Sequence, residues 1–188
     1  EVVFAWNGLG RFALDSVVFD NTAAPASWTV PSVASILTGQ PVAVHQVTED
    51  NSRVPRSLPS IGSEMRRAGY ASVAAGYNTF LRPGPPGRER GFQYGFDEYH
   101  FPVQRWFGDH GVPLPSAGFR NETYDKKFLY NSTVPLETFV LSWLDEHASE
   151  DFFFWIHFMD PHAPYNPPPP FKPDGVPGRI QHMAHATE

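Results

Sequence analysis

The segment that most constrains the fold is an apolar run at residues 152–158, in which His157 is the one polar residue. A strand with one face in solvent alternates apolar and polar residues, whereas a strand of a parallel sheet is covered on both faces and is apolar throughout. The run therefore predicts a buried parallel strand. It is far shorter than the roughly 20 residues that cross a membrane, so we expect no membrane segment in this chain.

Other segments alternate between strand and helix signals. Residues 16–21 form a short β-branched and aromatic run that predicts a strand, and residues 70–75 predict a second, buried one. Residues 133–147 place apolar side chains on one side at helical spacing, which predicts an amphipathic helix. Helices that alternate with apolar strands favour a layered α/β domain with a mostly parallel central sheet.

Two shorter helices are marked by their ends. Pro31 just inside a start and Gly39 just past an end predict a short helix with Thr29 at or beside its N-cap. Residues 59–67 predict another helix, which Gly69 would stop in the left-handed conformation.

Composition excludes several classes of function. The formal charge of −6 argues against a protein held to nucleic acid by a basic face. Because the chain has no cysteine, disulfides, thiolate metal sites and cysteine nucleophiles are excluded. We expect one domain, or a large part of one, over residues 1–188, with loops rich in proline and glycine near residues 82–87, 112–118 and 164–178.

Thr29 is the first candidate for chemistry. At a helix N-terminus its hydroxyl would face unpaired backbone N–H groups, which stabilise the oxygens of a transferring phosphoryl or sulfuryl group. A threonine hydroxyl is a poor nucleophile at neutral pH unless a base or a metal activates it. The alternative is that Thr29 simply caps the helix, and spacing alone favours the cap.

The second candidate group follows the apolar strand. Asp160 and His162 stand just past its end, where residues of open parallel sheets gather to form sites. Their oxygen and nitrogen atoms suit a divalent cation, and an imidazole can also hold an ester oxygen or protonate a leaving group. Asp160 before Pro161 has the alternative role of ending the strand through a turn. We expect His157 to be structural and His162 to be functional.

These residues resemble the core of the sulfatase family within the alkaline phosphatase superfamily. Four blocks occur in the family's order over roughly residues 12–171. They are the segment 17–39 with His45 downstream, the Met-Arg-Arg-Ala-Gly-Tyr segment 65–70, the Gly-Phe and Gly-Phe-Asp elements at 91–92 and 95–97, and the segment 154–165 with its following prolines.

The resemblance implies an alkaline-phosphatase-like α/β sandwich. It also implies that Thr29 attacks an ester while bound to one divalent metal ion, calcium or another cation, and that His162 contacts the transferred group or the leaving oxygen. We assign Ser32, Asn78 and Asp160 as candidate substrate-binding residues. The expected partner is a small anionic ester.

The chain also departs from the family pattern. Sulfatases carry cysteine or serine where Thr29 stands, and that residue is oxidised to formylglycine, which threonine cannot become. Val33 occupies the place of the motif's arginine, and residues 76–79 replace a Gly-Lys-Trp-His segment whose lysine and histidine bind the anion. The family's paired N-terminal aspartates and its late Asp-His or Asp-Asn segment have no counterpart here.

These departures predict a domain that is incomplete at both ends. Such a fragment of the N-terminal catalytic domain would be weakly active or inactive alone, because a metal site needs its full set of ligands. Three functions stay open for the full-length protein. They are a sulfate or phosphate ester hydrolase, a phosphoryl-group transferase, and a non-catalytic domain that binds an anionic ligand. A further alternative is a plain structural domain in which Thr29 is a helix cap and His162 is a loop residue.

Overall fold

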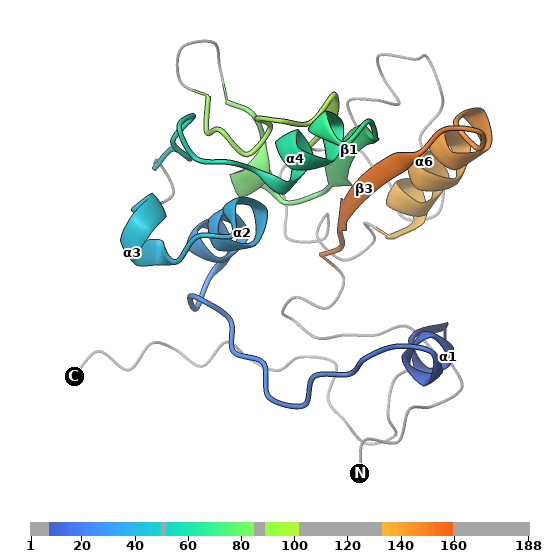
Figure 1. Ribbon diagram of the computed structural model, residues 1–188, viewed down its shortest axis with the longest axis horizontal. Helices are drawn as coiled ribbons and strands as arrows, with labels where there is room; N and C mark the ends of the chain where they lie inside the picture. The colour runs from blue at the N-terminus through green and yellow to red at the C-terminus, as the bar shows by residue number, and fades with distance from the viewer. Residues whose placement is uncertain (1–7, 50–51, 85–88, 102–132, 160–188) are drawn as a thin grey trace, which may run out of the picture.

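The computed structural model describes residues 8–49, 52–84, 89–101 and 133–159. Figure 1 traces the elements along the chain. In order they are the helices α1 (Gly8–Leu14), α2 (Thr29–Thr38), α3 (Val42–His45) and α4 (Ile61–Arg67), the strand β1 (Ala71–Gly76), the short 3-10 helix η1 (Thr79–Leu81), the strand β2 (Glu98–His100), the helix α6 (Thr133–Glu146) and the strand β3 (Phe152–His157).

The described strands form one parallel sheet in the order β2-β1-β3. Ala71 pairs with Phe152 at one end of the β1–β3 ladder and Gly76 pairs with His157 at the other. All described strands therefore end at the same edge of the sheet. The predicted α/β class with a parallel sheet is confirmed, and β3 covers the apolar run that predicted it.

Each face of the sheet packs against a different helix. On one face, α2 buries Val30, Val33, Ala34 and Leu37 in a cluster that also contains Ala74 of β1. On the other face, α6 buries its own apolar residues against Val73 and Ala75. Because successive strand residues point to opposite faces, β3 also divides its side chains between the two clusters. This explains why the run has no polar alternation. The expected full burial is wrong, because Phe152 is exposed and the rest of β3 is half-buried.

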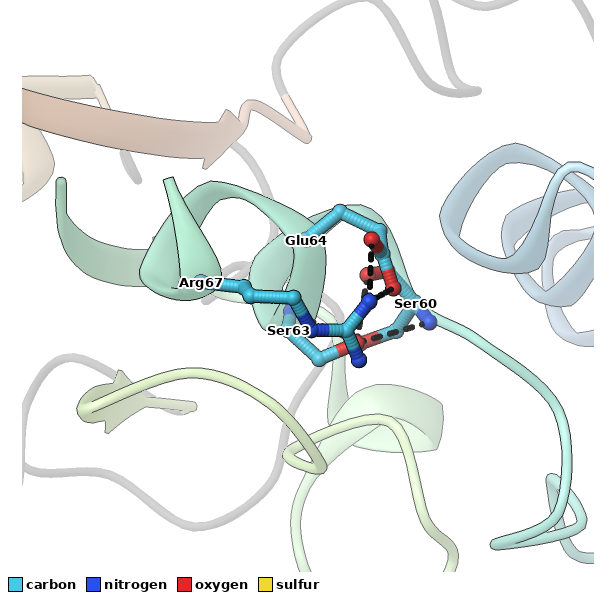
Figure 2. A network of polar contacts seen from close by, with 4 residues as sticks. All are labelled: Ser60, Ser63, Glu64 and Arg67. Carbon is cyan, nitrogen blue, oxygen red and sulfur yellow. Dashed lines mark hydrogen bonds and ion pairs between the residues drawn. The ribbon is translucent and has the colours of Figure 1, made fainter. Parts of the chain in front are cut away.

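The helix ends agree with the sequence signals. Gly39 follows α2 with a φ of 67°, and its N–H donates to the carbonyl of Ser35 at 2.9 Å. Gly69 has a φ of 96° after α4, as the left-handed stop requires. Figure 2 shows the start of α4, where Ser60 and Ser63 bond reciprocally across the first turn. This capping box satisfies two N–H groups that a helix start otherwise leaves unpaired.

The predicted strand at residues 16–21 is wrong. This segment forms no strand, and the side chains of Val17 and Phe19 are 81% and 77% exposed. Within the described residues the sheet consists of β2, β1 and β3, so the segment has no neighbouring strand to accept its backbone hydrogen bonds. Residue type alone could not supply that partner.

Gly76 ends β1 where two neighbours leave no room for a side chain. A Cβ atom there would lie 2.5 Å from Cε1 of Phe101 and 2.8 Å from the carbonyl oxygen of His157. The close approach fixes how the chain leaves the sheet towards Asn78. Among the described residues, no helix has the length and apolar content needed to span a membrane.

Candidate active site

Thr29 is the first residue of α2, directly after the N-cap residue Trp28. No side chain caps this helix start. The hydroxyl oxygen of Thr29 instead accepts a hydrogen bond from Nδ2 of Asn78, at 3.3 Å. The expected position beside the N-cap is confirmed, whereas the alternative in which the hydroxyl caps the helix is not observed. Thr29 as a whole is half-buried.

Asn78 stands two residues after β1 and is 3% exposed. Its Oδ1 accepts a hydrogen bond from the backbone N–H of Phe80 at 2.9 Å, which starts η1. Its Nδ2 lies 3.3 Å from Oγ1 of Thr29 and 3.4 Å from Sδ of Met159. One buried amide thus joins the start of α2 to the segment that follows β3.

The same contact places the end of β3. Met159 is 7% exposed and directly precedes Asp160 in the sequence. Thr29 and the chain as far as Met159 therefore lie at one edge of the sheet. Asp160 and His162 lie outside the described residues.

Ser32 and Val33 occupy the next turn of α2. The hydroxyl of Ser32 donates to the carbonyl oxygen of Ala26 at 2.8 Å, which ties the loop before α2 to the helix. Val33, at the place of the family's arginine, is 5% exposed and belongs to the apolar cluster under α2. Position 33 is therefore part of the packing against the sheet.

His157 ends β3 with its ring among aromatic side chains. Its ring centroid lies 6.4 Å from that of Phe101 and 5.9 Å from that of Trp155, both edge-on. Burial lowers the pKa of His157, which favours the neutral ring at neutral pH. Its Nδ1 has no hydrogen-bond partner among the described residues. This placement agrees with the structural role expected for His157.

His45 forms a second polar pair with α2. Its Nδ1 accepts from the backbone N–H of Val47 at 2.9 Å, so the proton of the neutral ring is on Nε2 and is shared with Oγ of Ser35 at 2.9 Å. A nitrogen that already carries a proton cannot take one from Ser35. The pair therefore links α2 to α3 and is not a nucleophile with its base.

Two aromatic residues beside Thr29 and Asn78 were not singled out from the sequence. The rings of Trp28 and Phe80 meet edge-to-face with centroids 6.1 Å apart, and they are 37% and 41% exposed. The usable signal was their position, since Trp28 directly precedes Thr29 and Phe80 follows Asn78 by two residues.

The described residues do not fit a metal ion by themselves. No group of three or more histidine, aspartate or glutamate side chains gathers within the part of the chain that the structure describes. Thr29 offers one oxygen at the site, and one ligand does not hold a divalent cation. The expected metal site remains a prediction that needs further ligands.

The structure thus has an α/β fold, and a threonine hydroxyl lies at the carboxyl edge of its parallel sheet. The fold resembles that of the phosphonate monoester hydrolase of Agrobacterium radiobacter, with a TM-score of 0.51 at 19% sequence identity. The match covers 78% of this chain and 34% of that one. Another phosphonate monoester hydrolase, from Silicibacter pomeroyi, has 19% identity and a TM-score of 0.42 over 68% of this chain and 31% of its own.

The model of the family described as Sulfatase matches residues 8–179. The chain therefore belongs to the sulfatase family, as the resemblance predicted. No curated protein sequence matches it significantly. The chain spans about a third of the hydrolase from Agrobacterium radiobacter, with 34% of that chain covered.

Proposed function

We propose that this chain supplies the nucleophile-bearing part of a sulfatase-family hydrolase that cleaves a small anionic ester. Thr29 provides the attacking oxygen, and His162 contacts the transferred group or the leaving oxygen. Ser32 and Asp160 are the candidate substrate-binding residues, and Asn78 lies beside Thr29 at the same site. The observation that carries this proposal is the Thr29 hydroxyl, which does not cap its helix and is held 3.3 Å from Asn78 at the carboxyl edge of the sheet.

The connection to the second motif supports the same proposal. Asn78 also lies 3.4 Å from Sδ of Met159, and Asp160 is the next residue along the chain. His162 follows two residues later. A chain spans at most about 3.6 Å per residue, and His162 is three residues beyond Met159 in the sequence, which supports its assignment to the same site.

The proposed reaction has two displacements. In the first, the Thr29 hydroxyl gives its proton to a general base while Oγ1 forms a bond to sulfur or phosphorus. The bond to the leaving oxygen breaks, and that oxygen takes a proton from a general acid. In the second, water gives a proton to a general base as it attacks sulfur or phosphorus, the bond to Oγ1 breaks, and the Thr29 oxygen takes a proton from a general acid. A formylglycine hydrate can expel sulfate by collapsing to an aldehyde, but a threonine ester has no such route and needs this hydrolysis.

Two indications about the type of ester conflict. The family points to sulfate esters, whereas a threonine nucleophile suits phosphoryl groups. The structural neighbour named above is a phosphonate monoester hydrolase, but at 19% identity the likeness concerns the fold. The substrate panel for this protein therefore includes an aryl sulfate, a phosphodiester and a phosphonate monoester.

A specific observation favours a second candidate function, which is binding without catalysis. Val33 is buried in the core where the family has an arginine, and residues 77–79 carry no cationic side chain. A site with fewer cations stabilises a transition state less well and can still hold an anion. The catalytic and binding proposals differ in whether the Thr29 oxygen reacts.

The test compares Thr29→Ala with Thr138→Ala in the protein that carries this chain in full. Thr138 lies on α6, where its exposed hydroxyl donates to the carbonyl of Val134, so the control makes the same substitution in another helix. With divalent metal present, we expect Thr29→Ala to abolish turnover of every ester in the panel and Thr138→Ala to leave it unchanged.

Retained turnover in Thr29→Ala would exclude Thr29 as the nucleophile. Unchanged biological activity without any turnover would favour the binding domain. Transfer of the phosphoryl group to an alcohol in place of water would favour the transferase. The 188-residue chain alone is expected to be inactive, and appreciable turnover by it would contradict that expectation.

A further inference from the structure

The amide of Asn78 has one possible orientation. Oxygen and nitrogen of a carboxamide are hard to tell apart by position, and the hydrogen-bond partners must decide. A backbone N–H can only donate, so the N–H of Phe80 at 2.9 Å must face Oδ1. The NH2 group therefore faces the other side, where Oγ1 of Thr29 lies 3.3 Å away and Sδ of Met159 lies 3.4 Å away.

This orientation also directs the Thr29 hydroxyl. A hydroxyl has one hydrogen to donate and two lone pairs to accept with. Because Asn78 can only donate at this contact, one lone pair of Oγ1 is occupied and the hydroxyl hydrogen must point elsewhere. The second lone pair stays available for an electrophile.

The chain around Asn78 has little freedom to move. Gly76 lies against the ring of Phe101 and the backbone of His157, with no space for even a methyl group. On the other side, η1 ends in Leu81, which is fully buried and whose carbonyl accepts a hydrogen bond from the Tyr99 hydroxyl at 2.7 Å. Asn78 is thus held from both directions along the chain.

We propose that Asn78 is a positioning residue that acts through Thr29, in place of the direct substrate contact assigned to it from the sequence. Its fixed N–H group holds the nucleophilic oxygen at the carboxyl edge of the sheet with one lone pair free. Its contact with Met159 ties the same amide to the end of β3. This inference rests on the proposed function, because it assumes that Thr29 reacts.

The first experiment detects the hydrogen bond between Asn78 and Thr29 directly, in the 188-residue chain. Thr29→Val removes the hydroxyl and keeps the side-chain shape, and we expect it to shift the side-chain NH2 signals of Asn78 in a ¹⁵N–¹H spectrum and to speed their exchange with solvent. Thr38→Val is the matched control. Thr38 lies nine residues further along α2, about 13.5 Å away at 1.5 Å per residue, so its substitution should leave those signals in place. Asn78 signals that respond equally to both variants, or to neither, would overturn the inference.

The second experiment measures kinetics in the full protein. Asn78→Asp keeps an oxygen that accepts from the N–H of Phe80 but removes the N–H group that faces Thr29. A misplaced nucleophile lowers kcat, so we expect kcat to fall by about 10- to 100-fold in Asn78→Asp and in Asn78→Ala. KM is compared in the uncharged Asn78→Ala, where we expect it to stay within about twofold, because the new carboxylate of Asn78→Asp itself repels an anionic ester. Asn78→Ala also loses the contact with Phe80, and it still reports kcat if the aspartate variant does not fold.

The outcomes separate the two proposals. A raised KM with unchanged kcat would show that Asn78 binds substrate directly, and unchanged values of both would show that it does neither. Either result overturns the positioning role while leaving Thr29 as the nucleophile, provided that Thr29→Ala is inactive. Activity in Thr29→Ala would instead refute the proposed function itself, whatever the Asn78 variants do.

Discussion

Gly76→Ala probes the point where β1 ends and the chain turns towards the candidate site. The added Cβ would lie 2.5 Å from the ring of Phe101 and 2.8 Å from the carbonyl oxygen of His157, both well inside the 3.4 Å at which ordinary contacts begin. The Phe101 ring is 3% exposed and stacks on Tyr99 and Trp155, with centroids 4.8 and 5.5 Å away. It therefore cannot swing aside freely.

The oxygen of His157 is a harder obstacle, because it belongs to the backbone of β3. Relief of that contact requires β3 to move away from β1 at the last pair of their ladder. Overpacking of this kind costs about 1–3 kcal/mol, and the two immobile neighbours place Gly76→Ala near the upper end. At about 2–4 °C per kcal/mol for a chain of this size, the expected loss in Tm is about 4–12 °C.

Urea unfolding followed by circular dichroism measures the loss in unfolding free energy, and a thermal melt measures the loss in Tm. Gly8→Ala is the matched control, since a Cβ at Gly8 would meet nothing within 4 Å. We expect this control not to lower the unfolding free energy, because Gly8 begins α1 and alanine is the better helix former. If both variants unfold at the same urea concentration, the close approach of β1, Phe101 and β3 is refuted, and with it the reason given for the fixed position of Asn78.

Three further predictions concern stability. Phe139→Ala removes a fully buried side chain on α6 and should cost about 3–5 kcal/mol in unfolding free energy. The control Phe12→Ala changes an exposed residue and should cost less than about 0.5 kcal/mol, and equal losses would contradict the packing of α6 on the sheet. Ser60→Ala removes the capping box of α4 and should cost about 1 kcal/mol by urea unfolding, and no loss would mean that the cap is not formed. Burial lowers the pKa of His45 and His157, so the unfolded chain binds more protons below about pH 6.5. Stability is then fully present above that pH and is lost as the pH falls, by up to about 1.4 kcal/mol per pH unit for each ring, and a flat profile between pH 7.5 and 5 would contradict this.

Much of the fold follows from local signals in the sequence. The apolar run that became β3 and the glycines after α2 and α4 each act through a few neighbouring residues, so they can be read without coordinates. The strand expected at residues 16–21 failed because a strand also needs a partner, and pairing is not a property of the segment itself. The half-burial of β3 could not be read from its composition for the same reason.

The candidate site, too, could be predicted only where it depends on local sequence. The sequence named Thr29 and Asn78, and it placed Thr29 beside a helix start. It could not tell whether the hydroxyl caps the helix or faces the sheet edge, because that depends on an amide 49 residues further along. Trp28 and Phe80 were missed because their pairing also spans distant parts of the chain.

By itself, the sequence determined the α/β class, the parallel character of its most apolar strand, the sulfatase family and the residue types available for chemistry. These depend on periodicity and on short motifs. The tertiary structure decided which of those residues meet. Asn78 reaches Thr29 and Met159 because β1 and β3 run parallel and end at one edge, and a contact between residues so far apart in the chain exists only after the sheet has formed.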